Sequence, residues 1–200
     1  MWIKICGMTT PDAVAAALDA KVDAIGFVLA KSVRQVTPEA ALRLAEPARG
    51  RVRCVAVTRH PTQQDIDAIT SIFKPDVLQT DLADLPSLRL PTHLEILPVL
   101  RGAPGDAQPL PKRFLFEGPT SGAGIACDWS VARAVARRGE LVLAGGLNPA
   151  NVAQAIAAVQ PFGVDVSTGV EVRPGVKGPA EIAKFVQAAR ESRAVCEDPV

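Results

Sequence analysis

The sequence has few of the residues that build metal sites, and its cysteines lie far apart. The chain of 200 residues has only two histidines, and its four cysteines form no Cys-x-x-Cys pair. Zinc sites need several histidine or cysteine ligands at short spacings, so we expect no metal site. Widely separated cysteines without a pairing pattern are typical of reduced thiols, and we therefore expect a cytoplasmic protein.

An excess of charge of one sign is also missing. The chain has 22 lysines and arginines against 21 aspartates and glutamates, which gives a net charge of +1. Such a chain has no general attraction to nucleic acid or to a membrane surface, so we expect any anion to be bound by a local site. No apolar run approaches the roughly 18 residues that cross a bilayer. Met1 is followed at once by a strand-like run, which leaves no room for a signal peptide.

What the chain does have is a regular alternation of two kinds of segment. Hydrophobic residues make up 48% of the chain, enough for a sizeable core. Eight short apolar runs predict β-strands, and alanine-rich segments between most of them predict helices. The runs are residues 2–6, 24–29, 51–57, 75–80, 94–100, 113–118, 141–146 and 163–169. Eight such units favour a compact single-domain (β/α)8 TIM barrel over residues 1–200, with an open doubly wound sheet as the alternative.

Capping residues indicate where several helices begin. Thr10 and Thr37 each precede a proline, which is the pattern of a capped helix start. Asn148 precedes Pro149 after the seventh run, and we expect Asn148 to cap the helix that follows.

Prolines predict an irregular connection around the fourth and fifth units. Pro86, Pro91 and Pro98 crowd this stretch and leave little room for helices, so we expect loops or single turns there. The last helix is expected over residues 179–191, and residues 193–200 are expected to form a frayed tail.

Two of the predicted strand ends carry side chains suited to proton transfer. Active sites of such barrels lie where the strands end. Alternation places Lys4 and Cys6 on one face of the first strand, and Glu117 ends the sixth. Cys6 is either a base at the barrel mouth or an inert core thiol, and Glu117 is either a buried acid or a solvated carboxylate. We expect Asp165, on the eighth strand, to form a structural ion pair with Lys4 inside the barrel.

The loops after the seventh and eighth runs are rich in glycine and hydroxyl groups. Barrels often bind phosphate here, through backbone N–H groups that glycine leaves accessible. The candidate phosphate ligands are Gly145, Gly146, Ser167, Thr168 and Gly169. The alternative is that these glycines only form tight turns. Arg34, in the loop after the second run, is either a carboxylate ligand or a solvated side chain.

Four segments together resemble the phosphoribosylanthranilate isomerases of tryptophan biosynthesis. They are "KICGMT", "GFVLAKSVRQV", "LAGGLNPANV" and "VDVSTGVEVRPGVKG", in this order over nearly the whole chain. The resemblance implies an Amadori rearrangement by general acid/base catalysis, without metal or organic cofactor. It further implies that Cys6 is the general base, that Arg34 contacts the anthranilate end of the substrate, that Gln79 binds substrate, and that the two glycine-bearing loops hold the phosphate.

The sequence departs from that family in three places. Where the family has an aspartate as general acid after the sixth strand, this chain has Glu117, which is longer by one methylene. The family's "LQLHG" is "LQTDL" here, so Gln79 is kept but the His-Gly pair is missing. Val33 stands in place of a proline in the loop that carries Arg34. These changes affect the loops at the barrel mouth and leave the expected fold unchanged.

Two other functions fit part of this pattern. Another phosphosugar barrel enzyme, such as an epimerase or a synthase, would share the phosphate loops but would not need a cysteine base on the first strand. A non-catalytic phosphosugar-binding or interaction protein would be consistent with the missing His-Gly pair. We expect a small phosphosugar substrate as the partner, and the sequence leaves open whether the protein is a monomer or a homodimer.

Overall fold

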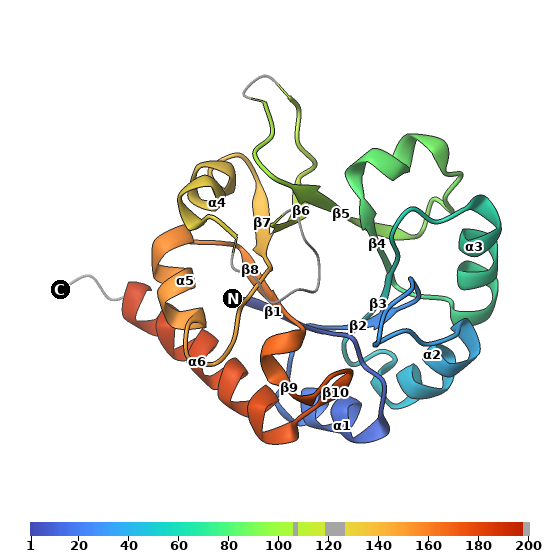
Figure 1. The fold of residues 1–200 in the computed structure, drawn as a ribbon, viewed down its shortest axis with the longest axis horizontal. Coiled ribbons are helices and arrows are strands. Elements are labelled where there is room, and N and C mark those ends of the chain that lie inside the picture. Colours follow the sequence, from blue (N-terminus) through green and yellow to red (C-terminus); the bar gives the residue numbers. More distant parts are fainter. Residues whose placement is uncertain (106–107, 119–126, 198–200) are drawn as a thin grey trace.

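Eight parallel strands close into a barrel in the computed structural model, which describes residues 1–105, 108–118 and 127–197 (Figure 1). Each strand pairs with the next along the chain, and β8 pairs in parallel with β1. The strands are β1 (Trp2–Cys6), β2 (Ala24–Val28), β3 (Arg53–Val57), β4 (Val77–Asp81), β5 (Glu95–Arg101), β6 (Arg113–Glu117), β7 (Glu140–Leu143) and β8 (Gly163–Val166). The predicted (β/α)8 barrel is confirmed, and the open sheet is excluded.

Helices surround the barrel (Figure 1). The α-helices are α1 (Pro11–Asp19), α2 (Pro38–Ala45), α3 (Gln63–Ala68), α4 (Trp129–Ala136), α5 (Val152–Val159) and α6 (Pro179–Glu197). Short helical turns are η1 (Glu46–Ala48), η2 (Ile69–Phe73), η3 (Leu82–Ser87) and η4 (Thr168–Val170). Within the described part of the chain, no helix is both long and apolar enough to cross a membrane.

The predicted helix starts are confirmed at two positions and wrong at one. The side chains of Thr10 and Thr37 accept hydrogen bonds from the third residue beyond them, as N-caps do. Asn148 does not cap α5, which begins at Val152 with Asn151 as its N-cap residue. The Asn148 side chain instead accepts bonds from the backbone N–H groups of Ala150 and Asn151, at 2.8 and 3.1 Å. It thus closes a turn ahead of the helix, a use that competes with capping.

The fourth and fifth units are irregular, as predicted. After β4 the chain forms only the short turn η3, which contains Pro86. After β5, no helix occurs among the described residues 102–105 and 108–112. At the other end of the chain, α6 continues past the expected end at residue 191, and residues 198–200 of the expected tail lie outside the described residues.

The barrel has an apolar core on each side of its wall. One core lies inside the barrel and the other between the strands and the helices, because successive side chains of each strand point to opposite faces. A buried ion pair also lies inside the barrel: Lys4 Nζ is 2.9 Å from Asp165 Oδ1, and these residues are register partners on β1 and β8. The predicted ion pair is therefore confirmed.

Candidate active site

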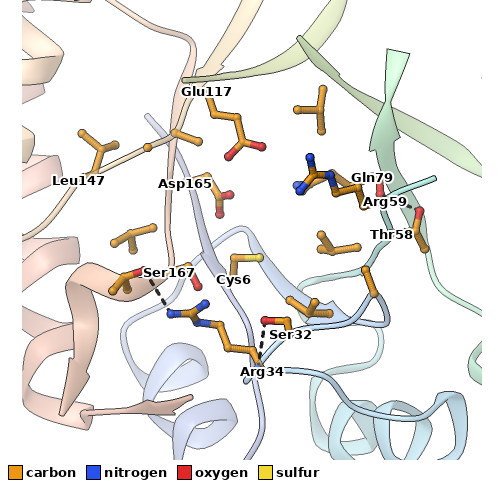
Figure 2. Close-up of a pocket in the computed structure, with 18 of the residues that line it drawn as sticks. Cys6, Ser32, Arg34, Thr58, Arg59, Gln79, Glu117, Leu147, Asp165 and Ser167 are labelled. Atoms are coloured by element: carbon orange, nitrogen blue, oxygen red, sulfur yellow. Dashed lines mark hydrogen bonds between the residues drawn. The ribbon is translucent and has the colours of Figure 1, made fainter. Parts of the chain in front are cut away.

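A cavity of about 350 Å³ lies at the end of the barrel where the strands terminate. Figure 2 shows side chains from several strands pointing into it. The cavity brings together every residue that the sequence identified as a candidate. These are Cys6, Arg34, Gln79, Glu117, Gly145, Gly146, Ser167, Thr168 and Gly169.

Cys6 ends β1 and lies at the bottom of this cavity, 7% exposed. Burial raises the pKa of the Cys6 thiol above its ordinary value. Lys4 opposes this most strongly, Asp165 adds to it, and Lys177 opposes it more weakly. The cavity thus contains a thiol whose ionisation depends on the buried charges around it.

Glu117 ends β6 and points into the same cavity, across from Cys6 (Figure 2). Its Oε1 atom lies 2.5 Å from Nη1 of Arg101, the last residue of β5. Arg101 is itself held by Asp81, the last residue of β4, through a 2.8 Å bond from Nε to Oδ1. The ends of three successive strands therefore carry one connected network of two carboxylates and a guanidinium.

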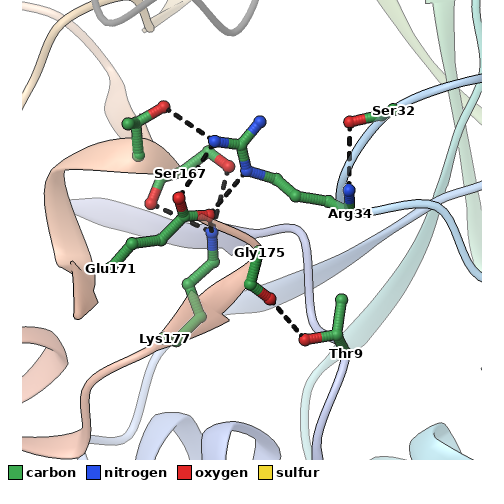
Figure 3. Close-up of polar contacts among 8 residues, drawn as sticks. Thr9, Ser32, Arg34, Ser167, Glu171, Gly175 and Lys177 are labelled. Atoms are coloured by element: carbon green, nitrogen blue, oxygen red, sulfur yellow. Dashed lines mark hydrogen bonds and ion pairs between the residues drawn. The ribbon is translucent and has the colours of Figure 1, made fainter. Parts of the chain in front are cut away.

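Arg34 is fixed by groups that follow β8. Its Nε and Nη2 donate to the two carboxylate oxygens of Glu171, at 2.6 and 3.0 Å, and Nη2 also donates to Thr168 Oγ1 at 3.2 Å (Figure 3). Glu171 begins the short strand β9 (Glu171–Arg173), which pairs with β10 (Val176–Lys177). This bidentate pairing fixes the plane of the guanidinium, and Nη1 points away from Glu171.

Lys177 completes this cluster from β10. Its Nζ lies 2.7 Å from Glu171 Oε1 and about as close to the backbone and side-chain oxygens of Ser167, at 3.0 and 3.1 Å. Burial acts to raise the pKa of Glu171, but the bonds from Arg34 and Lys177 outweigh it and hold that pKa below its ordinary value. The loop after β8 is thereby joined to the loop that carries Arg34.

The two glycine-bearing loops pack against each other on one side of the cavity. Gly145 and Gly146 have φ values of 91° and 67°, which other residues rarely adopt. A Cβ on Gly169 would lie 2.0 Å from the backbone oxygen of Leu147, so the loops can approach this closely only with glycine. The backbone of both loops therefore borders the cavity at short range.

Gln79 offers an acceptor that the described residues leave unused. Its side chain is buried on β4, and its Oε1 atom has no hydrogen-bond partner among them. A buried polar atom without a partner costs stability unless a ligand or water supplies a donor. Gln79 is therefore suited to accept a hydrogen bond from a bound molecule.

One group of side chains in the described part of the chain has metal-ligand chemistry. It consists of His60, Asp81 and Asp84. His60 Nδ1 is 2.9 Å from Asp84 Oδ1, and Asp81 is bound by Arg101, so each acidic group already has a partner. Contacts within the protein therefore account for this group: a hydrogen bond between His60 and Asp84 and an ion pair between Asp81 and Arg101.

Comparison with known proteins connects this site to a family. The sequence pattern of the N-(5'phosphoribosyl)anthranilate (PRA) isomerase family matches residues 3–188. The chain belongs to this family. It is 38% identical over 209 residues to N-(5'-phosphoribosyl)anthranilate isomerase of Rhizobium rhizogenes, covering 95% of this chain and 94% of the relative. It is 39% identical over 210 residues to the Mesorhizobium japonicum protein of the same name, covering 96% of each.

Solved structures of phosphoribosylanthranilate isomerases have the same fold. TrpF from Jonesia denitrificans matches with a TM-score of 0.78 and 37% identity, covering 96% of this chain and 98% of that one. The isomerase from Thermotoga maritima matches with a TM-score of 0.81 and 28% identity, covering 96% and 99%. Another match, at a TM-score of 0.76 and 27% identity with the same coverage, is a phosphoribosylanthranilate isomerase in complex with reduced 1-(o-carboxyphenylamino)-1-deoxyribulose 5-phosphate.

Arg101, Glu171 and Lys177 are among the site residues of this isomerase-family chain that sequence reasoning missed. Alternation along β5 carried a signal for Arg101, because Leu97 and Val99 belong to the inner core and Arg101 is next on the same face. The carboxylate of Glu171 reaches Arg34 across 137 residues of chain, a contact that no local pattern specifies.

Proposed function

We propose that this chain catalyses the Amadori rearrangement of N-(5-phosphoribosyl)anthranilate to 1-(2-carboxyphenylamino)-1-deoxyribulose 5-phosphate, with Cys6 as general base and Glu117 as general acid. This is the third step of tryptophan synthesis from chorismate. The observation that carries the proposal is the placement of these two side chains in one cavity, on β1 and β6, so that they can flank a bound sugar. The reaction needs no cofactor, because both proton transfers use side chains of this chain.

Each group handles one proton. Glu117 gives a proton to the furanose ring oxygen, whose bond to C1′ breaks to form a Schiff base with the anthranilate nitrogen. The Cys6 thiolate then removes the proton from C2′, which leaves an enolamine, and this tautomerises to the ketone. The two protons are transferred at different atoms of the sugar, and Cys6 and Glu117 enter the cavity from different strands, which supports the division of roles (Figure 2).

Arg101 affects the protonation state of Glu117, the proposed acid. A guanidinium at 2.5 Å favours a carboxylate over a carboxylic acid. We therefore propose that the substrate loosens the contact between Arg101 and Glu117 when it enters the cavity. The buried acceptor on Gln79 is proposed to bind a sugar hydroxyl.

The phosphate is proposed to bind at the backbone of the loops around Gly145–Gly146 and Ser167–Gly169. Replacing Gly146 with valine should raise KM for the substrate at least about tenfold, because a branched side chain is strained at a φ of 67° and holds the anion away from the backbone. Steady-state kinetics measure this effect. Gly50→Val is the matched control, because Gly50 has a similar φ of 72° in open space. An unchanged KM for Gly146→Val would place the phosphate elsewhere.

Arg34 is proposed to hold the anthranilate carboxylate through its remaining nitrogen, Nη1. Replacing Arg34 with alanine should cost about 2–5 kcal/mol of binding, because it removes a charge-assisted partner that Glu171 holds in place. The loss should be much larger for anthranilate-bearing ligands than for ribose 5-phosphate, as measured by isothermal titration. Arg53→Ala, which removes an exposed ion pair with Glu95, serves as the control. Equal losses for both ligands would contradict the assignment.

Turnover separates this function from its alternatives. The substrate should lose its anthranilate-type fluorescence when the purified protein is added. A different phosphosugar enzyme or a binding protein would leave that signal unchanged. The proposed partner is this small phosphosugar alone, in the cytoplasm, with the protein as a monomer or a homodimer. One related structure concerns monomers generated from a dimeric isomerase of Thermotoga maritima, so light scattering on this chain is the direct test.

A further inference from the structure

A lysine with no solvent exposure lies directly beneath Cys6. Lys4 and Cys6 are two positions apart on β1 and face the inside of the barrel, and Lys4 is 0% exposed. In many proteins, the free energy needed to transfer two charged groups from water to the interior is as large as the free energy gained from their attraction. A contribution to the stability of the fold therefore does not by itself explain why Lys4 and Asp165 are paired inside the barrel.

Gly26 gives Lys4 and Cys6 room to lie side by side. It is the register partner of Cys6 on β2. A Cβ built at Gly26 would lie 3.0 Å from the Cys6 sulfur and 3.1 Å from Cε of Lys4. The sulfur and the end of the lysine side chain thus border the same small space, which any side chain larger than hydrogen would fill.

We propose that Lys4 is a positioning residue for Cys6. The buried ammonium ion of Lys4 stabilises the Cys6 thiolate, and the negative charge of Asp165 partly cancels this stabilisation. A lysine ammonium has three N–H donors, and Asp165 accepts one of them at 2.9 Å, so others can face the sulfur. Lys4 and Cys6 favour each other's charged forms: burial acts to lower the pKa of Lys4, but Asp165 and Cys6 hold it above its ordinary value.

Other charged groups near the sulfur are less suited to this task. Lys177, on β10, has three acceptors of its own, two on Ser167 and one on Glu171. Glu171 also binds Arg34, so the N–H donors of Lys177 and two nitrogens of Arg34 are directed at groups other than the sulfur. Asp165, on β8, opposes ionisation of the thiol. Lys4 is thus the strongest positive influence on Cys6.

The sign of each charge allows a test with two opposite outcomes. Asp165→Asn keeps the shape and an oxygen for Lys4 but removes the charge that opposes ionisation of the thiol. The Cys6 thiolate then replaces Asp165 as the anion that holds the charge of Lys4, so the variant should increase the Cys6 thiolate fraction at neutral pH. Lys4→Met should decrease it. Because a tenfold change in this fraction corresponds to one unit of pKa, we expect iodoacetamide to alkylate Cys6 about threefold faster in Asp165→Asn and about tenfold slower in Lys4→Met. The rate is read from the Cys6 peptide by mass spectrometry as a function of pH.

The controls separate this effect from misfolding. Lys184→Met removes a lysine from an exposed ion pair with Glu181 and should leave the alkylation rate of Cys6 unchanged. Lys4→Met leaves a buried carboxylate without its partner and can fail to fold, in which case Asp165→Asn carries the test by itself. An alkylation rate in Asp165→Asn that is unchanged or slower would overturn the inference.

The effect of Lys4 on the Cys6 thiolate does not depend on the proposed function. Only the consequence for catalysis rests on that function. If Cys6 is the base, the pH dependence of kcat/KM in Asp165→Asn should shift in the same direction as the alkylation rate. If Cys6→Ala stays active, the proposed role of Cys6 fails even where the alkylation shifts occur. If Cys6→Ala is inactive and both variants alkylate like wild type, the inference about Lys4 alone fails.

Discussion

Glu117→Gln is expected to lower kcat by about 10²–10⁴-fold, with a much smaller change in substrate binding. Glutamine has nearly the shape of glutamate but has no acidic proton for the ring oxygen. Its amide can still face Arg101, so the network at the ends of β4, β5 and β6 keeps its arrangement. Initial-rate kinetics at saturating substrate measure this loss.

Glu140→Gln is the matched control for this variant. Glu140 begins β7, at the opposite end of the barrel, and pairs with Arg113 at 2.7 Å. The same chemical change there should leave kcat near the wild-type value. A nearly active Glu117→Gln enzyme would remove Glu117 from the mechanism. That result would point to Asp81, which Arg101 holds, or to Asp128, whose carboxylate accepts backbone bonds as the N-cap of α4, as the acid.

Glu117→Asp, which restores the aspartate common in the family, is expected to recover only part of the activity. The shorter side chain withdraws the carboxyl group by roughly 1.5 Å, and a displacement of about one ångström can cost about 10²-fold. It also withdraws from Arg101, which the longer side chain meets at 2.5 Å. A wild-type kcat for Glu117→Asp would show that this side-chain length is not adapted to its surroundings.

The strands and their inward faces could be predicted because both follow from patterns along the chain. Apolar runs located all eight strands, and a period of two placed Lys4 and Asp165 inside the barrel. Their contact followed from one further step, that the first and eighth strands of a closed barrel are neighbours. The residues that the resemblance identified lie around one cavity, because the ends of parallel strands meet there.

Contacts made by long side chains between loops could not be predicted in this way. The seventh and eighth strands were expected to end at residues 146 and 169. In the structure, β7 ends at Leu143 and β8 at Val166, where the chain turns over the cavity. Arg34 binds Glu171 because the β9–β10 hairpin folds back towards the loop after β2, and alternation does not determine that path. Asn148 was misassigned for a similar reason: two asparagines lie close together, and only the geometry of the turn decides which one occupies the N-cap position.

Cys6→Ala is expected to lower kcat by at least about 10²-fold, because alanine cannot accept the C2′ proton. Cys6→Ser should be about as slow, since its hydroxyl has a similar shape but is a weak base near neutral pH. Cys54→Ala and Cys127→Ala are the controls and should keep nearly wild-type kcat. Burial raises the pKa of both thiols to about 11, and neither lines the cavity.

The pH dependence of the wild-type enzyme gives the same assignment a second test. Because burial raises the pKa of Cys6, only a minor fraction is thiolate at neutral pH, and the thiolate fraction should rise as the pH is raised towards that pKa. In kcat/KM this rise is opposed by deprotonation of Glu117, which Arg101 favours in the free enzyme, so the rate of alkylation is the direct readout. Iodoacetamide should inactivate the enzyme with the same pH dependence, and the product should protect it by covering Cys6 in the cavity. A fully active Cys6→Ala enzyme, or inactivation that follows alkylation of Cys127 instead, would refute the role of Cys6. An inactivation rate that rises with pH towards this raised pKa would show that the reactive group is the thiol that Lys4 and Asp165 surround.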